Sequence, residues 1–190
     1  MSWINRLEYL DQQVIVLLNG NNIMFLDNIM WFISKPIFGL PFYIFFIFLF
    51  FKNYSFKNAL LILIVIGLTV GLGDFTAHEL IKESVQRYRP SHNLEITNQL
   101  NFVYNYKGGQ FGFVSNHATN MSIVGIMVFL VLKKYYPKSW IYLLTLVLMI
   151  SYSRIYLGVH YLSDIIGGWV LGSIFSLIAY NTINKLILKE

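Results

Sequence analysis

The fold is decided by residues 153–184, which read SRIYLGVHYLSDIIGGWVLGSIFSLIAYNTIN. After Asp164 this stretch contains no Asp, Glu, Lys or Arg, and it is long enough for a helix that spans a lipid bilayer. A small residue recurs every four positions, at Gly168, Gly172 and Ser176. Such a stripe forms a face on which membrane helices pack closely. The same step leads back to Asp164 and His160, so a polar site is expected where this span begins.

The composition of the whole chain is that of a membrane protein. Only 12% of its 190 residues are charged and 56% are hydrophobic, whereas soluble domains carry roughly 25% charged residues. The net charge of +5 is not gathered into a basic run longer than Lys133-Lys134, so nucleic acid is excluded as an expected partner. The absence of cysteine excludes disulfides, thiolate metal sites and cysteine nucleophiles. The mass of 22.2 kDa leaves room for a single domain, residues 1–190.

The same absence of Asp, Glu, Lys and Arg marks four other stretches: residues 36–51, 58–73, 108–132 and 139–153. Several are only about 16 residues long, or roughly 24 Å as a helix, so they must extend into their flanks to cross a hydrocarbon core of about 30 Å. We expect the first to reach back over residues 30–32, with kinks at Pro36 and Pro41. The second continues to Lys82 and the fourth to Arg154. The predicted fold class is therefore all-α, an integral membrane bundle of about five to six helices.

The second span is expected to resemble the last one. Gly67 and Gly71 form a small-residue face in mid-membrane, and Asp74, His78 and Lys82 follow within the same sector of the helix. His78 and Asp74 are expected to form a structural hydrogen-bonded pair. Ionisable groups at this depth are costly, so a functional site is the preferred interpretation.

The N-terminal segment, residues 1–22, does not resemble a cleaved signal. Glu8 and Asp11 come early, and the apolar run at residues 14–18 is too short for a signal-peptide core. It is predicted to be a short amphipathic helix at the membrane interface.

The kinds of basic residue predict the orientation of the spans. Alternating them across the membrane puts loops 52–57 and 133–138 and the tail 185–190 on one side, with seven lysines and one acid. The other side holds seven basic residues, including every arginine, together with eight acids. Because arginine suits anion binding, the arginines are interpreted as site residues rather than as topology signals. The lysine side and the C-terminus are therefore predicted to be cytoplasmic, and the arginine side faces outward.

This topology gathers one set of polar side chains at the outer edge of the membrane: Lys82, Arg89, Ser115, Asn116, His117, Arg154, His160 and Asp164. Three cations around two histidines suit a phosphate group, and Ser115 can cap a helix whose N-terminus also favours an anion. Asp164 can accept the Nδ1 proton of His160 and leave Nε2 as a free lone pair for attack on phosphorus. His117 could protonate the departing oxygen, while the cations stabilise the charge of the transition state.

Three segments carry a family resemblance. Residues 82–90 (KESVQRYRP), 114–117 (VSNH) and 153–164 (SRIYLGVHYLSD) resemble the signature motifs of the type 2 phosphatidic acid phosphatase (PAP2) superfamily. The family patterns are Lys, six residues, Arg-Pro; then Pro-Ser-Gly-His; then Ser-Arg, five residues, His, three residues, Asp. The first and third match at every specified position. The middle one has Val114 for Pro and Asn116 for Gly, which affects the expected geometry of the phosphate site and the substrate preference.

The resemblance implies a membrane phosphatase that needs no metal or cofactor and reacts through a phosphohistidine. Carried over by position, His160 is the nucleophile, Asp164 its orienting partner and His117 the acid. The phosphate binders are Lys82, Arg89, Ser115 and Arg154, and the amide of Asn116 is an additional donor. The expected substrate is a lipid-linked phosphate in a bacterial cytoplasmic membrane, with the site facing the periplasm. Undecaprenyl diphosphate is favoured over phosphatidylglycerophosphate, phosphatidic acid and lipid A, and the oligomeric state stays open.

Several alternatives remain beside this interpretation. His117, His160 and Asp164 could ligate a metal, although the surrounding cations argue against a dication. An anion transporter would use the same cations, but no internal repeat is detectable in the sequence. A catalytically inactive protein that binds lipid phosphates is a third possibility. His92 is expected to be solvated, and the aromatic residues of the outer loop, residues 83–114, are either interface anchors or a lid.

Overall fold

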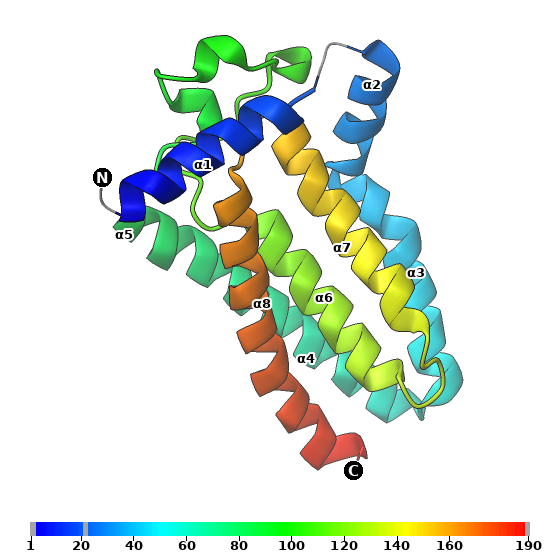
Figure 1. Ribbon diagram of the computed structural model, residues 1–190. Helices are drawn as coiled ribbons and strands as arrows, with labels where there is room; N and C mark the ends of the chain where they lie inside the picture. Colours follow the sequence, from blue (N-terminus) through cyan, green and yellow to red (C-terminus); the bar gives the residue numbers. More distant parts are fainter. Residues whose placement is uncertain (1–2, 21–22, 189–190) are drawn as a thin grey trace.

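The computed structural model describes residues 3–20 and 23–188 and consists of helices joined by loops (Figure 1). The helices are α1 (Trp3–Leu18), α2 (Met24–Ile33), α3 (Pro36–Asn53), α4 (Phe56–Phe75), α5 (Glu83–Val85), α6 (Asn116–Leu132), α7 (Ser139–Tyr156) and α8 (Leu162–Ile183). The π-helical segments η1 (Thr76–Lys82) and η5 (Asn184–Leu188) continue α4 and α8, and the short 3₁₀ helices η2 (Pro90–His92), η3 (Thr97–Gln99) and η4 (Val103–Asn105) lie in the long loop. The predicted all-α class is confirmed. Residues 1–2 and 21–22, at the two ends of the segment predicted as an interfacial helix, lie outside the described residues. So do residues 189–190, at the end of the lysine tail.

Four helical stretches are long and apolar enough to cross a membrane: Pro36–Asn53, Phe56–Val85, Ser139–Tyr156 and Leu162–Leu188. The helices α2 and α6 are apolar but shorter. The protein is therefore a multi-pass membrane protein. The second and fourth spans do reach Lys82 and Arg154, as predicted, and end a few residues later, at Val85 and Tyr156.

The uncharged stretch begins at Gly108, but the third helix begins where the predicted cap at Ser115 and the predicted outer loop, residues 83–114, put it: α6 starts at Asn116. One predicted span boundary was wrong. The first span does not extend back over residues 30–32, because α2 ends at Ile33 and α3 begins at Pro36. Proline disfavours helical geometry in the residue before it, and Lys35 has φ −84° and ψ 145°, which is extended backbone. Pro36 is instead the first residue of a new helix, where its missing N–H costs nothing.

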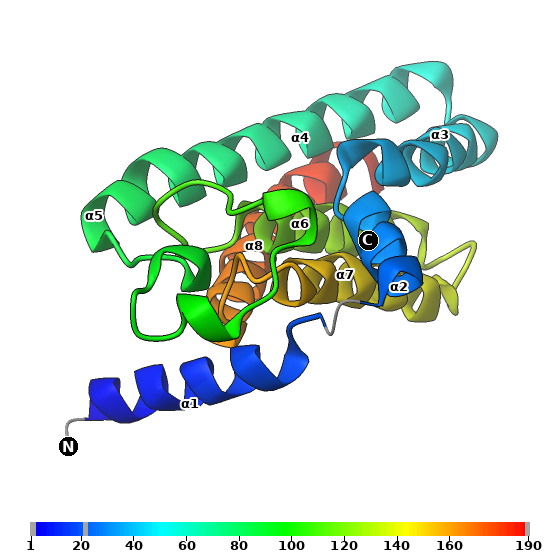
Figure 2. The same cartoon turned by 90° about the horizontal axis from the view of Figure 1, so that it is seen from above.

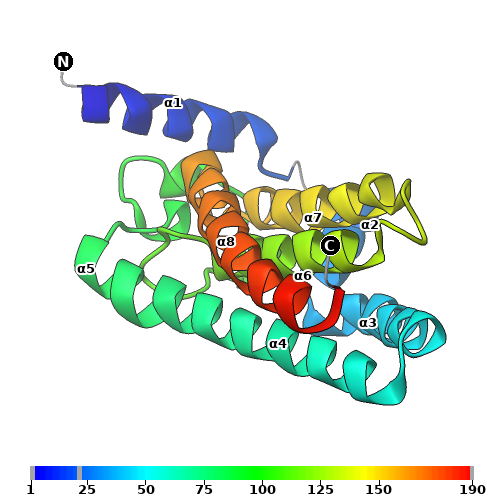
Figure 3. The ribbon, with the colours of Figure 1, turned by 90° about the horizontal axis from the view of Figure 1, so that it is seen from below.

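Helix α6 lies at the centre and packs against α4, α7 and α8. Figures 2 and 3 show α1 and α4 on opposite sides of α6, α7 and α8. The predicted small-residue face of α8 is confirmed, since a Cβ atom built at Gly168 would lie 2.8 Å from the carbonyl oxygen of Ser115. One at Gly172 would lie 2.6 Å from the carbonyl oxygen of Thr119. Any larger side chain at these positions would push α8 away from α6.

The corresponding prediction for α4 was wrong. A Cβ atom at Gly67 or Gly71 would meet nothing within 4 Å, and the buried face of α4 consists of Ala59, Ile62, Ile66, Thr69 and Gly73. The π-helical segment η1 then changes the rotation per residue, so a wheel drawn at 100° no longer predicts which side chains point inward. His78 is exposed and Lys82 is buried.

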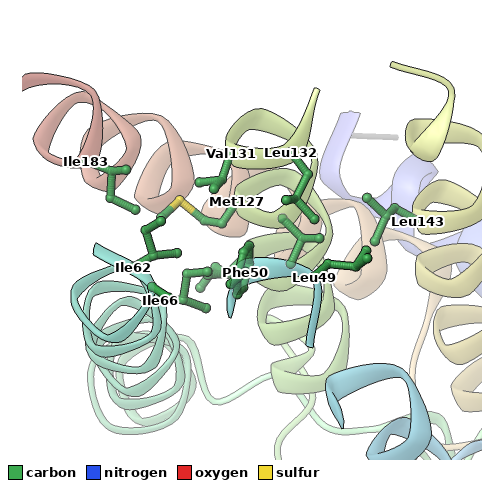
Figure 4. Close-up of a cluster of buried hydrophobic side chains, with 12 residues drawn as sticks. Leu49, Phe50, Ile62, Ile66, Met127, Val131, Leu132, Leu143 and Ile183 are labelled. Atoms are coloured by element: carbon green, nitrogen blue, oxygen red, sulfur yellow. The ribbon is translucent and has the colours of Figure 1, made fainter. Parts of the chain in front are cut away.

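The two ends of the bundle differ in content. We call the end at which α7 stops and α8 starts the site end, and the other the opposite end (Figure 1). The opposite end holds an apolar cluster from five helices, with Phe50, Ile62 and Met127 at its centre (Figure 4). The long loop and α1 lie at the site end, where α1 contacts α7 and α8.

Candidate active site

His160 and Asp164 are paired at the site end. His160 lies between α7 and α8 and is 1% exposed, and its Nδ1 is 3.3 Å from Oδ2 of Asp164. The same oxygen accepts the backbone N–H of Tyr161 at 2.9 Å, which caps α8. Because a carboxylate can only accept, Nδ1 carries the proton and Nε2 keeps a lone pair.

The environment of His160 keeps its imidazole neutral. Burial, followed by repulsion from Arg89, Arg154 and Lys82, holds the pKa of His160 well below its usual value. A neutral imidazole with a free Nε2 is the form that can act as a nucleophile.

His117 is the second residue of α6 and points towards the break between α2 and α3. Its Nε2 lies 3.2 Å from the carbonyl oxygen of Ser34. A carbonyl only accepts, so Nε2 of His117 carries a proton. Sequence reasoning did not find Ser34, whose only signal is its place just before the helix break at Pro36.

Arg154 closes α7 and is 3% exposed. One Nη donates to the hydroxyl of Ser34, and the other donates to the hydroxyl of Tyr106 at 3.2 Å. Its Nε is buried without a hydrogen-bond partner among the described residues. Tyr106 comes from the long loop, which the sequence predicted only as anchor or lid.

Arg89 is held by the same loop. Its Nε donates to the carbonyl oxygen of Phe111 at 2.9 Å. Gly108 has φ +67°, and a Cβ atom there would lie 2.5 Å from a guanidinium nitrogen of Arg89, so glycine is required for this close approach. Burial and the nearby charge of Arg154 lower the pKa of Arg89. A group of cations this close together favours an anion between them.

Lys82 is 5% exposed and bonds to Oδ1 of Asn116. The amide nitrogen of Asn116 donates to Oδ1 of Asp74 at 2.8 Å, and Asn120 donates to the same oxygen at 2.7 Å. Asn116, which stands where the family pattern has glycine, therefore joins Lys82 to Asp74. The predicted pairing of Asp74 with His78 was wrong, since Nδ1 of His78 lies 2.9 Å from Glu79 on the exposed side of η1.

Ser115 is confirmed as the N-cap of α6, because its hydroxyl accepts the N–H of Ala118 at 3.4 Å. The N-terminus of this helix therefore lies beside His117 and Asn116. His92 is half-buried in the loop, where its Nδ1 lies 3.1 Å from the hydroxyl of Ser91. No cluster of three or more His, Cys, Asp or Glu side chains that could hold a metal is found in residues 3–20 and 23–188.

Sequence reasoning also missed Arg87 and Asp11. Arg87 lies in the six-residue spacer of the first motif, and its Nη1 donates to Oδ1 of Asp164 at 2.9 Å. Its Nη2 donates to Asp11 of α1 at 2.8 Å. Burial acts to lower the pKa of Arg87, but Asp164 and Asp11 outweigh it and raise that pKa. The only sequence signal was that Asp11 and Arg87 are charged residues in a chain that has few of them.

Comparison with known proteins agrees with this fold and identifies its family. The family model of the PAP2 superfamily matches residues 58–188. The lipid A 4'-phosphatase of Porphyromonas gingivalis is 32% identical over 90% of this chain and 71% of its own length. That of Bacteroides thetaiotaomicron is 30% identical over 96% of this chain and 81% of its own. The crystal structure of a transmembrane PAP2-type phosphatidylglycerolphosphate phosphatase from Bacillus subtilis superimposes with a TM-score of 0.68 at 22% identity, covering 98% of this chain and 89% of that one.

A fold of membrane helices whose polar end carries two histidines, a carboxylate and three cations defines a membrane phosphatase. The chain belongs to the PAP2 superfamily.

Proposed function

We propose that this PAP2 lipid phosphatase acts through a phosphohistidine and without a metal ion. Nε2 of His160 attacks phosphorus, a P–N bond forms, and the P–O bond to the leaving group breaks. His117 acts in its doubly protonated form, which the negative charge of the bound phosphate favours; it passes the proton on Nε2 to the departing oxygen and becomes neutral. Water then attacks the phosphohistidine, gives its proton to His117 and releases inorganic phosphate, which restores both histidines.

The observation that carries this proposal is the proton arrangement of the two histidines. The contact with Asp164 leaves His160 with a free Nε2, and the contact with Ser34 keeps a proton on Nε2 of His117. The free Nε2 of His160 is what a nucleophile needs, and the contact with Ser34 shows which nitrogen of His117 would give its proton once phosphate is bound and the ring is doubly protonated. Lys82, Arg89 and Arg154 surround His160 and would stabilise the charge on the phosphate oxygens, together with the N-terminus of α6 capped by Ser115.

For the substrate we propose a phosphate monoester of the lipid A type. Two relatives named lipid A 4'-phosphatase match this chain at 30% identity or more over most of both lengths, which supports lipid A over the undecaprenyl diphosphate expected from the sequence. Phosphatidylglycerophosphate and phosphatidic acid are the remaining alternatives. Asn116 and Val114 are the two motif positions that depart from the family pattern, and Asn116 is the one in contact with Lys82.

We further propose that the protein lies in a bacterial cytoplasmic membrane with the site end facing the periplasm. The concentration of arginines at the site end and of lysines at the opposite end supports this orientation. The helix α1, whose side chains are mostly exposed apart from Asp11 and Ile15, would then lie along the outer interface.

Phosphate release from detergent-solubilised protein tests the proposal. Lipid A, undecaprenyl diphosphate, phosphatidylglycerophosphate and phosphatidic acid are compared at equal surface concentration, with and without EDTA. We expect lipid A to have the highest kcat/KM and EDTA to have no effect. Loss of activity that only added metal restores would refute the metal-free mechanism, and faster release from undecaprenyl diphosphate would refute the substrate assignment. A transporter or an inactive binding protein releases phosphate from none of the four.

A further inference from the structure

We infer that Asp11 and Arg87 are positioning residues that hold the carboxylate of Asp164 against His160, so that α1 is part of the catalytic apparatus. The inference rests on the proposed histidine-nucleophile reaction. It assigns a role to two charged groups that the mechanism above does not use: Asp11, which is buried, and Arg87, which is half-buried.

Both oxygens of Asp164 are occupied, and each has its own task. Oδ2 faces Nδ1 of His160 at 3.3 Å and accepts the N–H of Tyr161 at 2.9 Å. Oδ1 accepts from Arg87 at 2.9 Å. A carboxylate held on both sides cannot rotate about its Cβ–Cγ bond, so Oδ2 stays directed at the imidazole.

Arg87 is itself held from three directions. One Nη donates to the hydroxyl of Ser163 at 2.6 Å in addition to Asp164, and the other donates to Asp11 at 2.8 Å. The guanidinium also lies over the ring of Tyr161, with 4.2 Å between its central carbon and the ring centroid. A planar guanidinium held at both edges and on one face has a single position.

Asp11 completes the network from α1. It is 4% exposed, and its Oδ1 accepts the backbone N–H of Ser163 at 3.0 Å. Its Oδ2 accepts from Arg87 and from the hydroxyl of Ser163. Asp11 therefore binds both the first turn of α8 and the arginine that directs Asp164.

The charges of this network match the needs of the reaction. Transfer of phosphate to Nε2 puts positive charge on the imidazole of His160, and the negative charge of Asp164 stabilises it. A fully buried carboxylate is costly without a cation, and Arg87 supplies that cation. Because Arg87 also belongs to the segment that carries Lys82 and Arg89, the same segment positions the phosphate and the nucleophile.

A double-mutant cycle tests the inference. The kcat and KM of phosphate release are measured for Arg87→Gln, Asp11→Asn and Asp164→Asn and for Arg87→Gln combined with Asp164→Asn, on the panel lipid that the wild type hydrolyses fastest. We expect Arg87→Gln to lower kcat by about 10- to 100-fold, as loss of an outer positioning partner typically does. KM should stay within about twofold, because Lys82, Arg89 and Arg154 still bind the phosphate.

The combined variant separates positioning from general structure. If Arg87 acts through Asp164, Arg87→Gln lowers kcat by less than about twofold once Asp164 is already Asn. Arg87→Lys should recover part of the loss, since it keeps the charge but not the two-sided geometry. Arg6→Gln and Glu8→Gln, which remove exposed charges from the same helix as Asp11, are matched controls and should leave kcat unchanged.

The outcomes distinguish this inference from the function on which it rests. If the wild type releases no phosphate, or if Asp164→Asn is as fast as the wild type, the proposed mechanism is wrong. The alternative outcome is that Asp164→Asn alone is slow while adding Arg87→Gln to it lowers kcat by as much as Arg87→Gln does in the wild type. In that case the proposed mechanism stands and only the inference is wrong. If Arg87→Gln does not fold, Asp11→Asn is the deciding variant, because asparagine can still accept the N–H of Ser163. An unchanged kcat in Asp11→Asn would overturn the inference.

Discussion

Both ends of the helix bundle contain buried side chains, but different interactions stabilise them. The opposite end is filled by apolar side chains such as Phe50, Ile62 and Met127, which are interchangeable in chemistry and are specified mainly by volume (Figure 4). The site end is filled by His160, Asp164 and other polar groups whose hydrogen bonds have direction and whose charges need partners. Substitutions at the opposite end should therefore change stability, whereas substitutions at the site end should change the rate.

The site end is itself asymmetric. On the Asp164 side of His160, negative and positive groups alternate and each is paired, as in the contacts of Arg87 with Asp164 and Asp11. The other cations near His160, Arg89, Arg154 and Lys82, lower its pKa together with its burial. One set of charges is thus complete in its pairing, and the other is arranged for an anion.

The largest expected effect is that of His160→Gln. Glutamine keeps much of the volume of histidine but cannot form a phosphohistidine, so kcat should fall by about 10⁴-fold or more, as for loss of other covalent nucleophiles. Phosphate release and acid-labile labelling by a ³²P-labelled lipid phosphate measure this. The affinity for inorganic phosphate should stay within about threefold, because the cations are intact. A variant that retains more than a tenth of the wild-type kcat would exclude His160 as the nucleophile.

A substitution in the apolar cluster of the opposite end should change the stability of the protein but not its kcat. Met127 is fully buried in the apolar cluster, and Met127→Ala should lower the free energy of unfolding by about 2–5 kcal/mol through lost packing and a cavity. Thermal unfolding in detergent measures this change. The kcat of the protein that remains folded, assayed well below its unfolding temperature, should stay within about twofold. A large fall in kcat without a change in stability would show that the two ends are not independent.

The sequence predicts those parts of both ends that depend on local spacing. The small-residue step from Gly168 to Gly172 places α8 against α6, and the four-residue step from His160 to Asp164 brings these two side chains together. Ser115 precedes a helix and caps it. In each case the geometry follows from one turn of one helix, which a sequence pattern encodes directly.

What the sequence did not predict depends on contacts between distant segments or on a change of helical geometry. Arg87 is 76 residues from Asp11 along the chain, and their pairing requires α1 to pack beside the first turn of α8. The orientation of Lys82 depends on the π-helical segment η1, and the role of Ser34 depends on where α2 ends. A run of uncharged residues does not distinguish a helix from a loop, so the uncharged stretch from Gly108 does not by itself give the start of α6, whereas the cap at Ser115 does.

The two ends should also respond differently to pH. Below about pH 6.5 an unfolded chain protonates His160, whereas the folded protein keeps it neutral because burial and Arg89, Arg154 and Lys82 depress its pKa. Stability from this group is therefore complete above that pH and is lost as the pH falls, by up to about 1.4 kcal/mol per pH unit.

Thermal unfolding between pH 7 and pH 5 tests this dependence. The curve for His160→Gln should fall less steeply than that of the wild type, while Met127→Ala should be displaced by a constant amount. Parallel curves for wild type and His160→Gln would mean that His160 is protonated in the folded protein at pH 5.

The smallest effect is expected for Asn116→Gly, which restores the family residue. The variant removes the amide that joins Lys82 to Asp74, so the ammonium group loses one fixed partner while its charge and its access to phosphate remain. One hydrogen bond is worth about 1 kcal/mol, so KM should rise roughly fivefold at a nearly constant kcat. Asn120→Ala is the matched control, because Asn120 donates to the same oxygen of Asp74 and should leave KM unchanged if the effect passes through Lys82. Equal increases in both variants would instead identify Asp74 as the group that matters, and a lower KM in Asn116→Gly would mean that Asn116 competes with phosphate for the lysine.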